Sequence, residues 1–165
     1  MASSFESEMD EGRLPSGINT LTILTFIGSG LLTVFGIYGY LKSSENLAKM
    51  QETISKPEFE KMPDFAKKMF SPEALDLAQK MDANKVPVYT LSILGYLLCI
   101  FGAIEMRKLK MSGFYSYCLG SLLPYIGLFL FVGSSFLSGF ASYIGIGITL
   151  LFLLLYGLQT KNLTK

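Results

Sequence analysis

One long uncharged stretch limits what this chain can fold into more than any other feature. Met111 to Thr160, a run of 50 residues, contains no Asp, Glu, Lys or Arg. A single membrane span needs about 20 apolar residues, so this run is long enough for two. Small and polar residues at 132–139 form a turn-prone patch near its middle. The stretch therefore predicts a hairpin of two membrane-spanning helices, at about 113–132 and 137–159.

Two further apolar segments precede this hairpin. Residues 18–41 carry no charge, and residues 88–105 are uncharged up to their last residue. Only 16% of the chain is charged, against about 25% in soluble domains. The sequence therefore predicts an all-α membrane protein with four transmembrane helices, at about 18–41, 88–105, 113–132 and 137–159.

The polar parts of the chain complete the predicted domain organisation. Residues 1–16 are acidic and too polar to bury a core, so we expect a mobile tail before a single four-helix membrane domain at 17–165. Residues 43–86 carry too many charges to cross a bilayer. They predict short amphipathic helices outside the membrane, one capped by Ser44 and another beginning at Ser71-Pro72. We expect this segment to pack on the bundle or on a partner.

Small and hydroxyl side chains recur along one face of three predicted spans. Such residues let helices approach closely and hydrogen-bond inside lipid, so they predict helix packing; a polar transport path is the alternative for the hydroxyl stripe of the first span. The predicted packing residues are Thr25, Ser29, Thr33 and Gly36 in the first span, Gly95, Cys99 and Gly102 in the second, and Ala141, Gly145 and Thr149 in the fourth.

The end of the second span combines an acid with a short basic turn. An acid in a membrane segment is a functional candidate, so Glu105 is a candidate ion or proton relay, with an interfacial ion pair as the alternative. The residues that follow predict anchors at the membrane interface: Arg107, Lys108, Lys110, Tyr115 and Tyr117. Three basic residues in one turn favour a cytoplasmic position for this turn and for both termini.

The same junction carries a family resemblance. Residues 102–117 read GAIEMRKLKMSGFYSY: an apolar helix end, a Lys/Arg turn and an aromatic helix start. This pattern, about a tenth of the chain, resembles the helix–turn–helix junction of uncharacterised small bacterial four-span inner-membrane proteins. The resemblance implies a four-helix protein of the bacterial inner membrane and carries over no catalytic residues.

Composition narrows the functions to be expected. The chain has no His, which excludes imidazole-ligated haem and His-dependent catalytic triads, and we expect neither a cofactor nor enzyme activity. A net charge of +1 does not favour a nucleic acid partner. The expected partners are membrane lipid and other membrane-protein subunits, or further copies of the chain. The sequence thus favours an accessory subunit of a membrane complex, with a small oligomeric channel or transporter as the alternative.

Overall fold

A computed structural model of the chain describes residues 14–138 and 140–163, and every regular element in these ranges is helical. Four helices are long and apolar enough to cross a membrane, which confirms the all-α, four-span prediction. The elements, with 3-10 helices marked η, are α2 (Ser16–Ser55), η1 (Pro57–Lys61), α3 (Asp64–Met69), α4 (Pro72–Ala83), α5 (Lys85–Arg107), α6 (Met111–Val132), η2 (Gly133–Ser138), α7 (Phe140–Gln159) and η3 (Thr160–Asn162).

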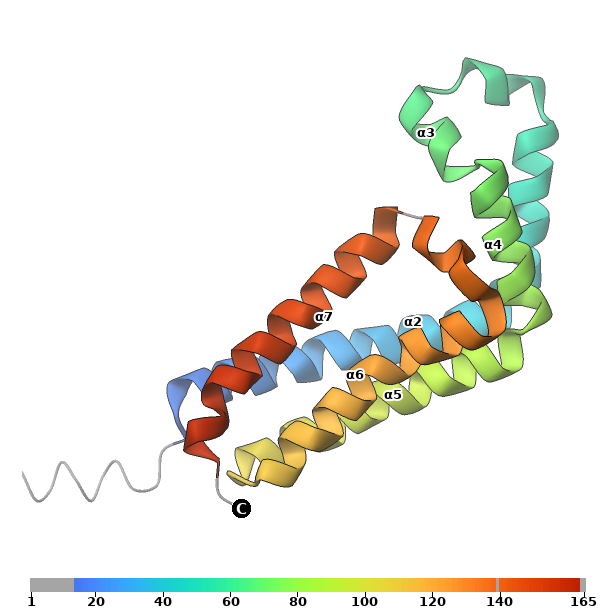
Figure 1. The fold of residues 1–165 in the computed structure, drawn as a ribbon. Helices are drawn as coiled ribbons and strands as arrows, with labels where there is room; N and C mark the ends of the chain where they lie inside the picture. The colour runs from blue at the N-terminus through green and yellow to red at the C-terminus, as the bar shows by residue number, and fades with distance from the viewer. Residues whose placement is uncertain (1–13, 139, 164–165) are drawn as a thin grey trace, which may run out of the picture.

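The four long helices run back and forth between two ends of the molecule. Figure 1 shows α5 and α6 as a tight antiparallel pair, with α2 alongside them and α7 inclined away from α6. The start of α2, the α5–α6 turn and the end of α7 lie at one end of the molecule. The α6–α7 connection lies at the other end. The chain therefore crosses the membrane four times if the long axis of this bundle lies along the bilayer normal.

Glycines bring α5 and α6 into backbone contact. A Cβ added at Gly102 would lie 2.6 Å from the carbonyl oxygen of Gly113, and one at Gly95 would lie 2.6 Å from that of Gly120. Gly95 and Gly102 lie seven residues apart on α5, and Gly113 and Gly120 lie seven residues apart on α6. This spacing keeps the glycines of each helix on one face of a left-handed helix pair. Any larger side chain at these positions would force the two helices apart.

Pro124 lies inside α6, opposite Gly95 of α5. Proline has no N–H, so the carbonyl oxygen four residues earlier, on Gly120, loses its helical donor. Gly95 leaves room for both groups, since a Cβ there would lie 2.8 Å from Pro124 Cδ as well as against the Gly120 oxygen. A Cα–H of Gly95 fills this place and can form the weak hydrogen bond to that oxygen that is common between packed helices.

The first long helix differs from its prediction. α2 continues without a break to Ser55, for 40 residues, so the expected end at 41 and the new helix capped by Ser44 are wrong. Residues 41–55 contain no Pro or Gly, and Glu45 forms ion pairs with Lys42 at 2.5 Å and Lys49 at 2.7 Å. Charge pairs at this spacing support a helix in water. The cap at Ser71 is confirmed, because its Oγ accepts a hydrogen bond from Ala74 N at 3.2 Å.

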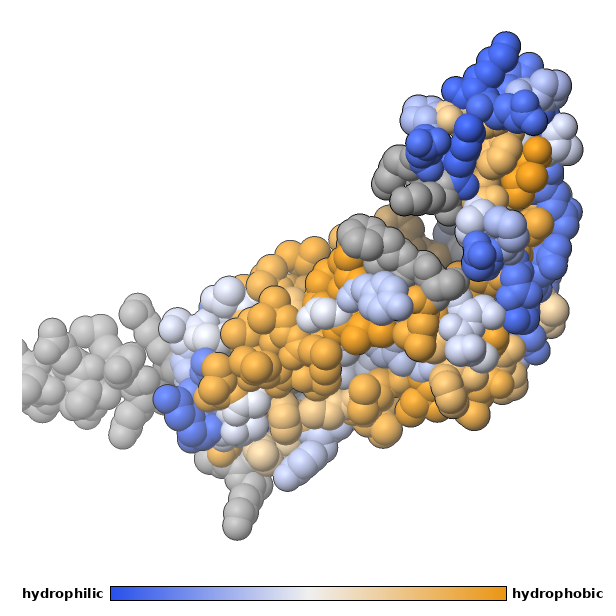
Figure 2. Space-filling view, turned by 45° about the horizontal axis from the view of Figure 1, so that its top comes forward, coloured by the Kyte–Doolittle hydropathy of each residue, from blue (hydrophilic) through white to orange (hydrophobic). Residues whose placement is uncertain are grey.

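Residues 43–84 form an arm, made of the last turns of α2 with η1, α3 and α4. The end of α2 runs beside α4, and at the tip the rings of Phe59 and Phe70 meet edge to face at 6.1 Å. Figures 1 and 2 show that this mostly hydrophilic arm projects beyond the apolar surface of the four long helices. At its base, however, α4 contacts α5, α6 and η2, so the expected packing on the bundle is found at the base of the arm and not at its tip; contact with a partner stays a prediction.

Candidate functional site

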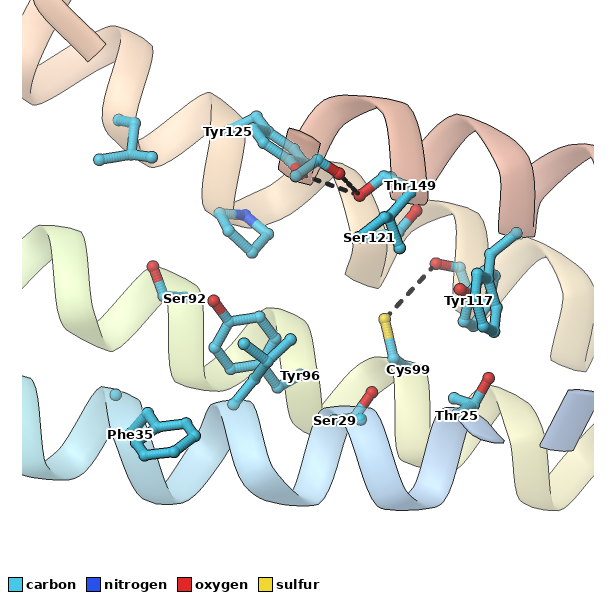
Figure 3. Close-up of a pocket in the computed structure, with 18 of the residues that line it drawn as sticks. Thr25, Ser29, Phe35, Ser92, Tyr96, Cys99, Tyr117, Ser121, Tyr125 and Thr149 are labelled. Atoms are coloured by element: carbon cyan, nitrogen blue, oxygen red, sulfur yellow. Dashed lines mark hydrogen bonds between the residues drawn. The ribbon is translucent and has the colours of Figure 1, made fainter. Parts of the chain in front are cut away.

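A cavity of about 490 Å³ lies between α2, α5, α6 and α7, and Met81 of α4 also lines it. Its volume is within the range of small-molecule sites. Leu24 and Phe35 of α2 and Ile148 of α7 line it while remaining 48%, 64% and 54% exposed, so the cavity opens at the surface between these two helices. Figure 3 shows the hydroxyl groups that face it, from Thr25, Ser29, Ser92, Tyr96, Tyr117, Ser121, Tyr125 and Thr149.

Two of these hydroxyls form hydrogen bonds only within their own helices. Ser92 donates to the carbonyl oxygen of Val88 at 2.8 Å, and Ser121 donates to that of Cys118 at 2.9 Å. This bonding to the preceding turn is the usual way in which a hydroxyl is accommodated in an apolar helix. These side chains thus add little free hydrogen-bonding capacity to the cavity.

Two further pairs of hydroxyls hold α7 to the bundle. The oxygens of Thr25 and Tyr156 lie 2.7 Å apart in a buried contact, and those of Tyr125 and Thr149 lie 2.9 Å apart. The ring of Tyr117 packs on that of Tyr156 with centroids 4.6 Å apart. Only 6% of the apolar window of α7 is buried. This helix therefore leaves most of its surface to lipid or to a partner.

Ser29 and Tyr96 are the exceptions among the cavity hydroxyls. Neither side chain forms a hydrogen bond with another residue in the described ranges, although Ser29 is only 8% exposed. Figure 3 shows their oxygens on α2 and α5, directed into the space between the helices. Since no fully buried side-chain oxygen in the described ranges lacks a hydrogen-bond partner, both oxygens keep surface open to the cavity and are available to a bound molecule.

The side chains that line the cavity are uncharged. None of its lining residues is Asp, Glu, Lys or Arg, so a charged group placed there would lack a counter-charge. Cys99, the one thiol that lines it, lies 3.8 Å from the backbone oxygen of Tyr117, a weak contact. The arrangement can bind an uncharged molecule; it does not place a nucleophile next to a base, the pairing that covalent catalysis uses.

The predicted packing residues do not share one helix contact. Gly95, Cys99 and Gly102 are buried on α5, where the glycines touch the backbone of α6. Thr25 and Ser29 are buried on α2 beside the cavity. Thr33 instead donates to the carbonyl oxygen of Ser29 at 2.7 Å. The remaining members are Gly36, with a missing Cβ 3.4 Å from Ile93; Gly145, with a missing Cβ 3.3 Å from Tyr125 Oη; Thr149, bonded to Tyr125; and Ala141, whose side chain lies outside the description.

Sequence reasoning missed the glycines of α6. Gly113, Gly120 and Gly127 all meet α5, and their missing Cβ atoms would lie 2.5–3.1 Å from its nearest atoms. Their signal is the seven-residue spacing, which matches the spacing of Gly95 and Gly102 on the facing helix. The hairpin therefore uses glycine on both of its helices.

Glu105 lies at the last turn of α5, beside the α5–α6 turn, and its side chain is 17% exposed. Its carboxylate accepts a hydrogen bond from Ser112 Oγ at 2.5 Å and lies 3.8 Å from Lys110 Nζ. This is the arrangement of the interfacial ion pair; a relay role stays a prediction. Arg107 donates to Thr22 Oγ1 at 3.4 Å, and Lys108 is exposed.

The two predicted tyrosine anchors differ. Tyr115 is 63% exposed, as an interface anchor should be, whereas Tyr117 is only 6% exposed. The prediction for Tyr117 as an interface anchor is therefore wrong. Residues two apart on an α-helix point about 200° apart, so when Tyr115 faces outward Tyr117 faces the bundle, where it packs on Tyr156.

The arm is joined to the start of α5. Asp82 accepts a hydrogen bond from Ser44 Oγ at 2.8 Å and lies 3.7 Å from Lys85 Nζ, which itself donates to Ser44 Oγ at 2.9 Å. Hydrogen bonds from Ser44 and then Ser43 hold the pKa of the Asp82 carboxyl below its usual range. The ends of α2, α4 and α5 are thus tied together by one polar cluster.

A second cluster joins the arm to the α6–α7 connection. Ser135 of η2 donates to Asp76 at 2.9 Å and accepts from Lys80 at 2.8 Å. Hydrogen bonds from Lys80 and Ser135 lower the pKa of Asp76. Asn84 Nδ2 also donates to the backbone oxygen of Phe131 at 3.1 Å. The arm therefore contacts both the start of α5 and the α6–α7 connection.

The fold and the cavity define an all-α membrane protein with four spanning helices and one projecting arm. No family model, curated protein or solved structure matches the chain. The resemblance of residues 102–117 to bacterial four-span proteins consequently stays a prediction.

Proposed function

We propose that this protein is a structural or accessory subunit that joins a larger membrane complex, with the arm as its docking element. The observation that carries the proposal is the attachment of the arm at two separate places, to Lys85 of α5 through the ion pair of Asp82 at 3.7 Å and to Ser135 of η2 through Asp76. An element fixed in advance loses less conformational freedom when it binds. A projecting arm of this kind favours contact with another protein.

The surface of the arm supports a specific rather than a general attraction. Its tip carries Glu58, Glu60 and Lys61, all exposed, and charges of both signs follow one another along it. Anionic lipid attracts segments with an excess of Lys and Arg, and the arm has no such excess. Charges of mixed sign suit a partner with a complementary pattern.

The exposed faces of the spanning helices provide the second part of the proposed contact. Gly147 and Gly157 of α7 have no neighbouring atom within 4 Å of a missing Cβ. Glycine on a lipid-facing surface lets a second helix approach closely. We propose that helices of other subunits, or of further copies of this chain, pack there.

We propose the bacterial inner membrane as the location, with both termini in the cytoplasm. Arg107, Lys108 and Lys110 belong to the end of α5 and the α5–α6 turn, which lies at the same end of the molecule as the start of α2 and the end of α7, and basic residues in short loops favour the cytoplasmic side. The resemblance of the junction to bacterial inner-membrane proteins supports the same assignment. The arm then lies on the opposite side of the membrane.

Site-specific photo-crosslinking in native membranes tests the docking role. A photo-reactive amino acid replaces Lys61 at the tip of the arm, and the control replaces the exposed Lys161 at the other end. We expect Lys61 to give a discrete adduct with one foreign protein and Lys161 to give none of the same mass. Equal, diffuse labelling from both positions would contradict the proposal. Ion-flux measurements on reconstituted protein test the channel or transporter alternative.

A further inference from the structure

We infer that the cavity between α2, α5, α6 and α7 binds one neutral, mostly hydrocarbon molecule that ends in a carbonyl oxygen and enters from the bilayer. This inference goes beyond the subunit role, because it concerns a ligand held inside the membrane and does not depend on any protein partner.

The shape of the cavity suits an elongated molecule. Its lining runs along α2 from Leu24 to Gly36 and along α5 from Val88 to Cys99. At 1.5 Å per residue each stretch is roughly 17–18 Å long. The cavity opens between α2 and α7 at the middle of their apolar spans, where the surrounding solvent is lipid. Molecules dissolved in the bilayer therefore have the most direct access.

The polar groups set the chemistry of the molecule. The lining contains no charged residue, so an ionic head group would be desolvated without compensation. Ser29 and Tyr96 each present a hydroxyl that has no hydrogen bond within the described part of the chain, while the hydroxyls of Ser92 and Ser121 are already used. A carbonyl oxygen has two lone pairs and no donor, so it can accept from such hydroxyls.

One position on the wall leaves space for the molecule. Gly28 lines the cavity next to Ser29 on α2, and a Cβ added there would have no atom within 4 Å. Gly30 has an equally open Cβ position but does not line the cavity. These two glycines provide a matched pair of sites, since an added Cβ meets no atom within 4 Å at either position.

The test uses an alkyl benzophenone, a neutral ketone that crosslinks to nearby C–H bonds under ultraviolet light, with the full chain in phosphatidylcholine nanodiscs. We expect labelling at cavity-lining residues that an excess of unlabelled alkyl ketone suppresses. Gly28→Leu, which fills the cavity, should reduce this labelling about tenfold or more. Gly30→Leu should leave it unchanged.

A second pair of variants tests the hydrogen bonds. Ser29→Ala and Tyr96→Phe should each weaken the apparent affinity about threefold to tenfold, as expected for one neutral hydrogen bond. Ser92→Ala removes a hydroxyl from the same cavity that is already bonded to Val88, so it should have little effect.

Two results would overturn the inference. Labelling spread over lipid-facing residues, with no competition and no difference between Gly28→Leu and Gly30→Leu, would show that ordinary bilayer chains occupy the opening. A native mass that falls from dimer to monomer with Gly28→Leu alone would show that a helix from a second copy fills the cavity.

Discussion

Replacing Gly102 with Ala tests the backbone contact between α5 and α6. The new Cβ would lie 2.6 Å from Gly113 O and 2.7 Å from Tyr117 N. Ordinary van der Waals contact begins at 3.4 Å, so the helices must separate by about 0.8 Å. Both obstacles are backbone atoms and cannot rotate away. Overpacking of this kind costs about 1–3 kcal/mol, and the better helix propensity of Ala returns up to about 1 kcal/mol.

We therefore expect Gly102→Ala to lower the free energy of unfolding by about 1–2 kcal/mol. The assay is a titration with sodium dodecyl sulfate in dodecyl maltoside micelles, followed by far-UV circular dichroism because the chain contains no Trp. The matched control is Gly30→Ala, a position with no atom within 4 Å. It should be neutral or more stable by up to about 1 kcal/mol. Equal effects of the two variants would refute the role assigned to the glycine contact.

Three further predictions follow from other contacts. In a double-mutant cycle, Tyr156→Phe and Thr25→Val should show a coupling of about 0.6 kcal/mol, the average for hydrogen bonds inside membranes; additive effects would contradict their 2.7 Å contact. Two flanking lysines lower the pKa of Glu45 to about 2 from 4.5, so its contribution to arm stability should be complete above pH 4.5 and decline as the pH falls toward 2, measured by hydrogen exchange at the end of α2. Cysteines at Lys108→Cys and Lys61→Cys should react with an impermeant maleimide from opposite sides of the membrane, and labelling of both from one side would contradict four crossings.

The hydropathy pattern was sufficient to predict the four spans. Uncharged runs such as Met111 to Thr160 have one stable solution in lipid, because helices satisfy their backbone groups internally. The continuation of α2 to Ser55 was harder to predict. Ser44 is a common helix start in sequences, but its hydroxyl instead pairs with Asp82, 38 residues away. Long-range partners of this kind leave no mark in local sequence.

The candidate site was predicted only in part. Small residues at Gly95 and Gly102 indicated helix contact, and the seven-residue spacing on α6 would have identified their partners. The cavity depends on the inclination of α7. It also depends on how α2 and α5 are placed along each other, because that placement brings Ser29 and Tyr96 to the same cavity. Neither property follows from the period of a single helix, so the sequence could show the hydroxyl stripe but not the space beside it.

The native mass of the complex tests the central claim most directly. The tagged chain would be extracted from its own membrane directly into nanodiscs, and every co-purifying chain would be identified and counted. The account predicts foreign membrane subunits in a fixed ratio, lost when charge reversals Glu58→Lys and Glu60→Lys are made at the tip of the arm. A homogeneous monomer or homo-oligomer without foreign chains, unchanged by those substitutions, would contradict it.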